Sequence, residues 1–477
     1  MSIKAIGSQR CIIDSRETAA TLLYSTDSGK IIEIFNELIL SLEDPRLKAF
    51  DIKIFEDVTP KVILPGLVDS HVHLNEPGRT DWEGFATGTQ AASSGGVTTV
   101  VDMPLNAIPP TINVANFNTK LKAAEGQLWC DVGFWGGLVP DNLEDLIPLV
   151  NAGVRGFKGF LMDSGVKEFP PIDKSYIENA MNELSDCKTM IMFHAELDTL
   201  LHESPNNNLH QKVDPCQYDS FLISRPDRFE FDAILLIIDC LKKSMAANPG
   251  KRPLVHIVHL ASMEAIPLIR QAHKDGLPIT AETCFHYLSL AAEKIGKGAT
   301  FCKCCPPIRN EKNRLGLWKG LREGSITSVV SDHSPCTPEL KQLEKGDFMS
   351  AWGGISSVGF GLPLLHTVGS TLNPPVSLIE IVKWCCENTA EQAGLEHRKG
   401  HLKIGYDADF VIFDPDAKQQ VSNPDVYFKN KLTAYDGQKF FGIVERTVLR
   451  GFTIFDASCG GSSESPLGKL ILEPRGG

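Results

Sequence analysis

Short apolar runs alternate with amphipathic segments through most of the chain. Segments with helical periodicity, such as 80–95, 142–153 and 262–276, follow most of the runs and end on a glycine, as helices often do. Near-continuous apolar strands that alternate with helices are typical of a parallel sheet covered on both faces. Eight runs of this kind predict an α/β fold, a closed (β/α)8 TIM-like barrel. The runs are residues 61–73, 96–104, 130–140, 153–162, 189–196, 253–262, 278–287 and 326–336.

The two ends of the chain follow a β-like pattern instead. Residues 21–35 read as two strands around the turn Asp27-Ser28-Gly29, and similar runs return at 400–415 and 445–456. An arm of about 60 residues would be marginally stable alone. We therefore expect residues 1–60 and 396–477 to pair into one small β-sandwich domain beside a barrel of residues 61–395.

One long insert interrupts the pattern. It follows the fifth predicted strand and includes Ser204-Pro205 and the asparagines at 206–208. We expect it to form a surface loop or extra helices near the barrel mouth.

Composition narrows the class of protein. The 477 residues are 42% hydrophobic, enough for a large core, and the net charge of −12 argues against nucleic acid or an anionic membrane as the main partner. No run approaches 18 apolar residues, and the first residues lack the apolar region of a signal peptide. These features predict a soluble, cytoplasmic protein.

The 13 cysteines are odd in number and spread through a long chain, so buried free thiols are expected. The cluster at 301–307, Phe-Cys-Lys-Cys-Cys-Pro-Pro, lacks the paired C-x-x-C spacing of a zinc site. We interpret it as structural or substrate-lining.

Potential metal ligands stand at the ends of five predicted strands. His71 and His73 are one residue apart, and a strand directs such side chains to the same face. Taken alone, this pair is more often two polar residues on a solvated surface. The active site of a barrel lies at the carboxyl ends of its strands, so all six residues are expected to meet there. The other four are Lys158, His194, His259 and Asp332.

The donor types indicate which metal fits. Four imidazoles and one carboxylate suit zinc or a similar borderline ion, whereas calcium and magnesium prefer oxygen ligands. A single catalytic zinc takes three protein ligands, so two ions about 3.5–4 Å apart fit this set better. Two ions need a bridging anion, and an unmodified Lys158 is a cation. The residues alone leave the bridge open.

From about Lys61 to about Pro415 the chain resembles the cyclic amidohydrolases, which include dihydroorotases, dihydropyrimidinases (hydantoinases) and allantoinases. Within this family the details look most like allantoinases. Asn75 stands where dihydroorotases usually have an arginine that binds the substrate carboxylate. Phe285 departs from the family, in which proline is usual, and affects only local strand packing. The segments that carry the resemblance include HVHLNEPGRTDWEGF (71–85), DMPLNAIPPT (102–111), GFKGFL (156–161), ETCFHYL (282–288), KCCPPIRN (303–310) and SDHSPC (331–336).

The resemblance implies two Zn²⁺ ions per subunit, with Mn²⁺ or Co²⁺ as alternatives. His71, His73 and Asp332 would hold one ion. His194 and His259 would hold the other.

The resemblance also supplies the bridge and the reaction. Lys158, converted by carbon dioxide to N6-carboxylysine, would bridge the two ions together with a hydroxide. Asp332 would be the catalytic base and then the acid. The implied reaction is hydrolysis of allantoin to allantoate, a step of purine (ureide) degradation, by a homotetramer.

Five further residues are candidates for substrate binding. Asn75, Arg79 and Asn106 could donate hydrogen bonds to ureido or ring carbonyls, or could cap loops. Cys305 could offer a backbone group to the ring, as the equivalent position does in hydantoinases. His333 directly follows Asp332 and is expected to face away from the metals, toward the substrate.

Four polar residues near the strand ends are expected to have supporting roles. His256 lies three residues before His259, on the opposite face of a strand, and is expected in the core. Glu282 and His286 are expected to support ligands from behind, and Asp102 to orient a neighbour.

Two alternative functions remain. A dihydroorotase or hydantoinase would perform the same chemistry on another ring, and a dihydroorotate carboxylate would call for an arginine. Asn75 speaks against that substrate, while Arg79 leaves room for it. A non-catalytic, dihydropyrimidinase-like assembly protein is disfavoured because all six ligand positions are present.

Overall fold

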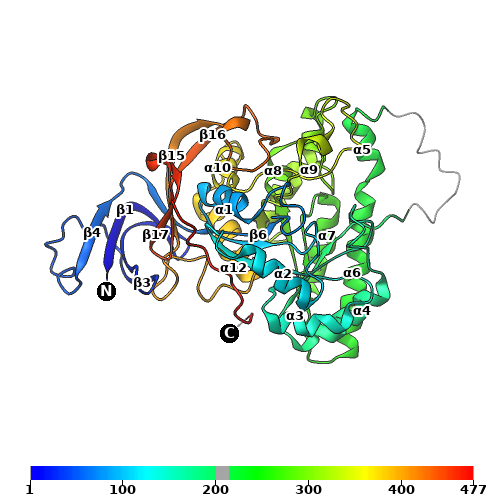
Figure 1. Ribbon diagram of the computed structural model, residues 1–477, viewed down its shortest axis with the longest axis horizontal. Helices are drawn as coiled ribbons and strands as arrows, with labels where there is room; N and C mark the ends of the chain where they lie inside the picture. The colour runs from blue at the N-terminus through cyan, green and yellow to red at the C-terminus, as the bar shows by residue number, and fades with distance from the viewer. Residues whose placement is uncertain (1, 200–213, 476–477) are drawn as a thin grey trace.

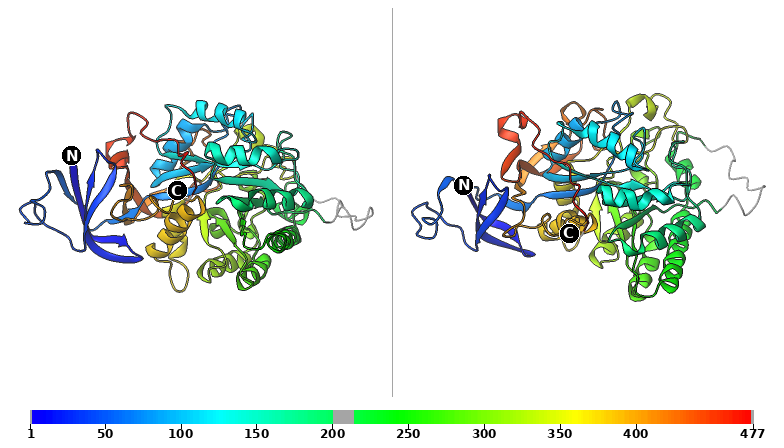
Figure 2. Two further views of the ribbon diagram at one scale, coloured as in Figure 1. Left: turned by 90° about the horizontal axis from the view of Figure 1, so that it is seen from below. Right: turned by 60° about the horizontal axis from the view of Figure 1, so that its bottom comes forward.

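The computed structural model describes residues 2–199 and 214–475 (Figure 1). Strands from both chain ends form a β-region on one side, and parallel strands with their helices form the other (Figure 1 and Figure 2). Within these ranges no helix combines the length and apolarity needed to cross a bilayer. The insert residues 204–208 lie outside the described residues.

Parallel strands occur at all eight predicted positions. Residue Trp135 separates the third run into two short strands, β8 and β9. Almost every residue of these strands is buried, as expected for strands covered on both faces. A three-stranded parallel sheet contains β6(Leu67–Val72), β7(Val97–Asp102) and β8(Asp131–Phe134). A six-stranded parallel sheet contains β9(Gly136–Gly137), β10(Gly156–Phe160), β11(Met190–His194), β12(Leu254–Ile257), β13(Ile279–Cys284) and β14(Ser328–Val330).

Helices follow the parallel strands and bury one apolar side each. In α6, Ile234, Ile237 and Leu241 are fully buried, while the lysines near its end are exposed. The N-caps follow sequence rules: Asn310, for example, accepts a hydrogen bond from the Asn313 amide at the start of α9. The helices of eight or more residues are α1(Phe85–Ser94), α2(Val114–Ala124), α4(Lys174–Glu183), α6(Asp227–Ala247), α7(Ile266–Lys274), α9(Glu311–Arg322) and α10(Gly361–Gly369). The shorter ones are α3(Leu146–Ala152), α5(Tyr218–Ser224), α8(Phe285–Ser289), α11(Leu378–Val382) and α12(Asn388–Gln392).

The two chain ends share one sheet. Its order is β18-β17-β16-β15-β5-β1-β2-β3, with β4 paired to β1. The predicted hairpin is present as β2 and β3, and Gly29 in its turn has φ 71°. The strands are β1(Ile3–Ile13), β2(Arg16–Ser25), β3(Lys30–Phe35), β4(Ile52–Asp57), β5(Val62–Pro65), β15(Phe410–Gln420), β16(Lys439–Leu449), β17(Phe452–Asp456) and β18(Gly461–Ser462).

The strand β5 joins the two arms, a role that the pattern did not reveal. The first predicted run, 61–73, continues through Gly66 without a break in hydrophobicity, yet its halves belong to different sheets. β5 pairs with β1 and β15, whereas β6 pairs with β7. A Cβ on Gly66 would lie 2.3 Å from the Thr98 hydroxyl, so only glycine fits at this crossing.

The cysteines behave as predicted. Within the described ranges all 13 are free, and most are buried.

Candidate active site

The six predicted ligands surround one cavity of about 440 Å³ at the carboxyl ends of the parallel strands. Neighbouring parallel strands end at the same edge of a sheet, which brings residues far apart in sequence together. His71 lies behind the cavity wall and contacts Lys158 and Asp332 in that wall. The ligand residues that line the cavity are His73, Lys158, His194, His259 and Asp332.

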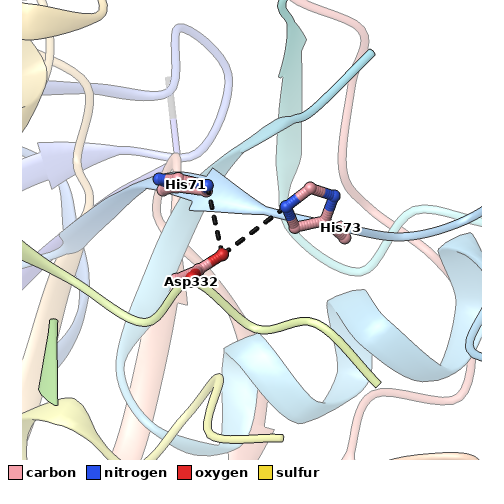
Figure 3. A group of neighbouring side chains, drawn as sticks. All are labelled: His71, His73 and Asp332. Carbon is pink, nitrogen blue, oxygen red and sulfur yellow. Dashed lines mark ion pairs between the residues drawn. The ribbon is translucent and has the colours of Figure 1, made fainter. Parts of the chain in front are cut away.

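His71, His73 and Asp332 form one group (Figure 3). The Asp332 Oδ1 atom lies 3.1 Å from His71 Nε2 and 3.5 Å from His73 Nε2. The two imidazoles come from β6 and the residue just after it, where the strand directs both to one face. All the candidate donor atoms of this group lie within 4.8 Å of one another, close enough to share one ion.

His194 and His259 form a second pair beside Lys158. His194 Nδ1 lies 3.0 Å from His259 Nε2, and the Lys158 ammonium lies 3.2 Å from His71 Nε2. The His71 and His259 rings are 5.4 Å apart, so the two groups are contiguous. The structure therefore brings together all six residues that the sequence singled out.

The backbone bends sharply at two of these residues. Asp332 has φ 44° and His259 has φ 40°, in the left-handed region that side chains other than glycine rarely adopt. Such strain persists only where surrounding contacts enforce it, and it gathers at functional sites. Here it turns both side chains toward the cavity just past their strands.

Buried glutamates select which imidazole nitrogen faces the cavity. Glu282 contacts His71 Nδ1 and thereby leaves Nε2 for the cavity side. Glu196 Oε2 lies 2.7 Å from His194 Nε2 and leaves Nδ1 for that side. An ionised carboxylate only accepts hydrogen bonds, so the nitrogen it contacts carries the hydrogen and the other has a free lone pair.

Burial and neighbouring charges keep most of the candidate ligands deprotonated, the state in which they can donate a lone pair to a metal. Burial alone would raise the pKa of Asp332, but His71 and His73 hold it well below its ordinary value. Burial lowers the pKa of His73 to about 4, and burial together with Lys158 lowers that of His259 well below its usual range. For His71, burial and Lys158 lower the pKa, but Asp332 and Glu282 outweigh them and raise it.

The donor set fits a divalent metal centre. Imidazole nitrogen and carboxylate oxygen are the ligands of borderline ions such as zinc. His194 Nδ1 and His259 Nε2 lie 3.0 Å apart on the cavity side, so both nitrogens can bind one cation. The residues present therefore fit a divalent metal.

Two of the five predicted substrate residues line the cavity. Asn106 lies beside the site, with its Nδ2 atom 3.5 Å from His73 Nδ1. Cys305 also lines the cavity, together with Cys304. The cysteine cluster is therefore partly cavity-lining, as one interpretation of the sequence held.

The other three have different partners and do not line the cavity. Arg79 donates to the Asn106 carbonyl and to Glu168, and its guanidinium lies over a tryptophan ring. Asn75 donates weakly to the Pro335 carbonyl. His333 lies 3.1 Å from Glu83 and accepts hydrogen bonds from two backbone amides. Each side chain is held by the loops around it, and their direct contact with substrate stays a prediction.

The supporting residues lie close to their expected places. His256 is in the core and contacts Thr280 and Glu282. Asp102 forms a buried ion pair with Lys120 and accepts a hydrogen bond from the Leu74 amide. His286 is buried against Asp332 but has no hydrogen-bond partner among the described residues, and burial lowers its pKa to about 4.

Sequence reasoning missed other residues of the cavity wall and its support. Arg225 and Trp352 line the cavity, and Glu196 supports His194. The two wall residues come from loops, whose positions no periodicity predicts. Lys303 also lines the cavity and belongs to the cluster 301–307, for which a substrate-lining role was one of the two interpretations. Glu196 follows His194 by two residues, but β11 ends at His194, so strand alternation does not predict the direction of its side chain.

Comparison with known proteins gives a consistent result. Residues 62–454 match the family described as "Amidohydrolase family". An allantoinase of Saccharomyces cerevisiae is 60% identical over 475 residues, covering 100% of both chains. An allantoinase of Streptomyces avermitilis is 44% identical over 87% of this chain and 88% of its own. Among solved structures, the L-hydantoinase (dihydropyrimidinase) of Arthrobacter aurescens is 25% identical, with a TM-score of 0.88, over 98% of this chain and 99% of its own.

Proposed function

Because this chain belongs to the amidohydrolase family and is 60% identical to an allantoinase over its whole length, we infer that it hydrolyses allantoin to allantoate. The observation that carries this proposal is the meeting of six ligand-type residues from five strands at one cavity. A chain without metal-dependent chemistry would have no reason to bury them together.

We propose that the parallel strands close into one (β/α)8 barrel. Two observations support closure, because each connects an edge of the three-stranded sheet with an edge of the six-stranded sheet. A single residue separates β8 from β9. A parallel bridge joins Val72, the last residue of β6, to His333, which follows β14. In this proposal residues 61–395 are the hydrolase barrel, and residues 1–60 and 396–477 build the β-sandwich domain, whose two parts are joined by β5.

We further propose two Zn²⁺ ions, or Mn²⁺ or Co²⁺ in their place, held by the residues around the cavity. His71, His73 and Asp332 would hold one ion, and His194 and His259 the other. When bound, such ions polarise a carbonyl and make water nucleophilic near neutral pH.

Lys158, as N6-carboxylysine, would bridge the two sites. Its ammonium lies against His71 rather than a carboxylate, and burial lowers its pKa to about 8. A larger fraction of neutral amine, the nucleophilic form, supports reaction with carbon dioxide.

The chain's own residues complete the reaction. Asp332 accepts a proton from the attacking water as the new carbon–oxygen bond forms at the ring amide. It then returns that proton to the ring nitrogen as the carbon–nitrogen bond breaks. Its low pKa keeps it ionised and able to accept the first proton.

The cavity wall favours a neutral ring substrate over dihydroorotate. A substrate carboxylate would call for an arginine whose charge is not already balanced. Arg79 is bound to Glu168 outside the cavity, and the charge of Arg225 in the wall is balanced by the buried Glu196. We retain Asn106 and Cys305 as substrate contacts. The tetrameric state and cytoplasmic location stay predictions.

A turnover panel tests the function. Metal-loaded protein is given allantoin, dihydroorotate, hydantoin and dihydrouracil, and ring opening is followed for each. We expect kcat/KM for allantoin to be about 10²-fold higher than for the others. Opening of dihydroorotate but not allantoin would contradict the assignment, and absence of metal in protein purified without chelator would favour the non-catalytic alternative.

A further inference from the structure

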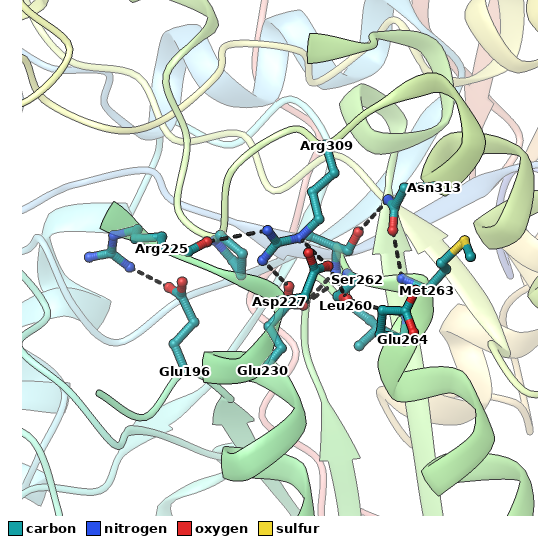
Figure 4. Close-up of polar contacts among 12 residues, drawn as sticks. Glu196, Arg225, Asp227, Glu230, Leu260, Ser262, Met263, Glu264, Arg309 and Asn313 are labelled. Carbon is teal, nitrogen blue, oxygen red and sulfur yellow. Dashed lines mark hydrogen bonds and ion pairs between the residues drawn. The ribbon is translucent and has the colours of Figure 1, made fainter. Parts of the chain in front are cut away.

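A chain of charged side chains connects the end of β11 with the loop after β12 (Figure 4). It begins at Glu196, a fully buried residue whose Oε2 contacts His194 Nε2. Arg225 donates to the same oxygen. The Arg225 guanidinium supplies the positive charge that the buried Glu196 carboxylate needs. It also lines the cavity.

The chain continues to the backbone that follows His259. The Arg225 carbonyl accepts from Arg309 Nη1 at 3.2 Å, and Arg309 Nη2 lies 2.9 Å from Glu230 Oε2. Glu230 Oε1 in turn accepts from the amides of Ala261 and Ser262, at 2.8 and 3.1 Å. Two ion pairs, Glu196 with Arg225 and Glu230 with Arg309, thus connect the segments that carry the two imidazoles, and the Arg225 carbonyl joins one pair to the other.

The His194 ring needs a contact that fixes its rotation about the Cβ–Cγ bond, because stacking on Phe160 does not fix it completely. Phe160 stacks on it with ring centroids 4.5 Å apart and planes 14° apart, which fixes the plane of the imidazole. Stacking does not fix which edge faces the cavity, because a half-turn of the ring keeps the plane. That turn would replace Nδ1 by a carbon atom opposite His259. The contact between Nε2 and Glu196 is what distinguishes the two orientations.

We propose that Glu196 is a positioning residue that holds the His194 ring with Nδ1 toward the cavity, and that Arg225, Arg309 and Glu230 brace it against the His259 loop. The inference deepens the proposed function and rests on it, since it assigns His194 Nδ1 to the second metal ion. It predicts that loss of the Glu196 acceptor weakens one ion specifically, while the ion held by His71, His73 and Asp332 remains.

The test compares Glu196→Ala with Glu196→Gln and the wild type. Metal content is measured by mass spectrometry, and the affinity for each ion by chelator competition. We expect Glu196→Ala to bind the second ion about 10–100-fold more weakly. Glu196→Gln keeps an oxygen that accepts from Nε2 and should restore most of this loss. Glu196→Met fills similar space without an oxygen acceptor and should not restore the loss, whereas a residue that only filled space would be replaced equally well by Gln and Met.

Glu83→Ala is the matched control. Glu83 is also fully buried and lies 3.1 Å from a histidine Nε2 atom, that of His333, which is outside the ligand set. We expect this variant to keep both ions at wild-type affinity. If Glu196→Ala does not fold, Arg225→Gln provides a second route, since it removes only the brace and should weaken the second ion in the same direction.

Crystals of metal-free wild type and Glu196 variants give a readout that is independent of metal. A His194 ring turned away from His259 in the variant supports the inference. Wild-type affinity for both ions together with an unturned ring overturns it. If the wild type itself holds fewer than two ions, the proposed metal centre fails, and the ring orientation alone then decides the role of Glu196.

Discussion

Two imidazoles in the site present opposite nitrogens to the cavity, His71 through Nε2 and His194 through Nδ1. The difference follows from where each supporting carboxylate lies. Glu282 is on β13, in the other parallel sheet, and reaches His71 Nδ1, whereas Glu196 follows its own histidine by two residues and reaches Nε2. The strand pattern identified Glu282 as a support. It missed Glu196 because β11 ends at His194, beyond which the two-residue alternation no longer sets side-chain directions.

Lys158 provides the sharpest prediction at the residue scale. Lys158→Ala removes the proposed bridge, so we expect loss of bound metal and of at least about 10²-fold in kcat, measured by mass spectrometry and turnover. Small carboxylic acids should restore part of both, because they can occupy the space of the carbamate. Lys158→Arg is the control, because the arginine side chain fills the space of the carbamate and added carboxylic acids should then restore neither metal nor turnover. Full turnover by Lys158→Ala without added acid would show that the bridge is wrong.

At the scale of elements, most strand and helix positions followed from periodicity and end signals. Periodicity did not predict that one strand ends and another begins at Gly66. β5 and β6 are equally apolar, and only their pairing partners differ. The helix ends are easier to predict where a glycine has a backbone conformation that others avoid. Gly153 ends α3 with φ 106°, and a Cβ there would lie 2.5 Å from the Leu472 carbonyl.

Gly153→Ala therefore combines backbone strain with a clash against the C-terminal segment. We expect it to lower the free energy of unfolding by about 2–4 kcal/mol, measured by urea denaturation. Gly126→Ala is the control, because Gly126 has φ 73° but nothing within 4 Å of its Cβ position, and strain alone costs about 1–2 kcal/mol. If both variants lost the same free energy of unfolding, the clash with Leu472 would contribute nothing, because the C-terminal segment moves aside.

At the scale of the whole molecule, one buried cation joins the parallel strands to the terminal sheet. Lys399 Nζ lies 2.8 Å from Asp131 on β8 and 2.6 Å from Asp409, just before β15, and contacts Asp407 at 3.0 Å. Arg450 adds a second cation to Asp131. Burial opposes ionisation of Asp131, but the two cations outweigh it and lower its pKa below the ordinary value.

Lys399→Met leaves the aspartates buried with less opposite charge, and we expect a loss of about 3–5 kcal/mol at neutral pH. In the wild type, the lowered pKa of Asp131 contributes stability above its unfolded pKa, and this is lost as pH falls through the folded value. In the variant, burial raises the aspartate pKa values, so protonation favours the folded state. The difference in unfolding free energy between the wild type and Lys399→Met should therefore be smaller at pH 5 than at pH 8. Urea denaturation of both proteins at the two pH values measures it.

Lys174→Met is the control for this prediction. Lys174 pairs with Asp239 at 2.7 Å, but both side chains are more than two-fifths exposed. Such a pair contributes about 0–1 kcal/mol. A pH-independent loss in Lys399→Met, or one as small as in the control, would contradict the junction role.

The alternation of strands and helices, the β-rich character of both ends and the six ligand-type residues could be predicted from the sequence, because local periodicity and strand ends show each of them. Only the folded chain shows that β5 lies between the two β-rich arms, and that Arg225 and Trp352 rather than Asn75, Arg79 and His333 line the cavity. It also shows which nitrogen each histidine presents. These choices depend on contacts between segments distant in the chain, and no local pattern of hydrophobicity or charge encodes which partner a buried group will meet.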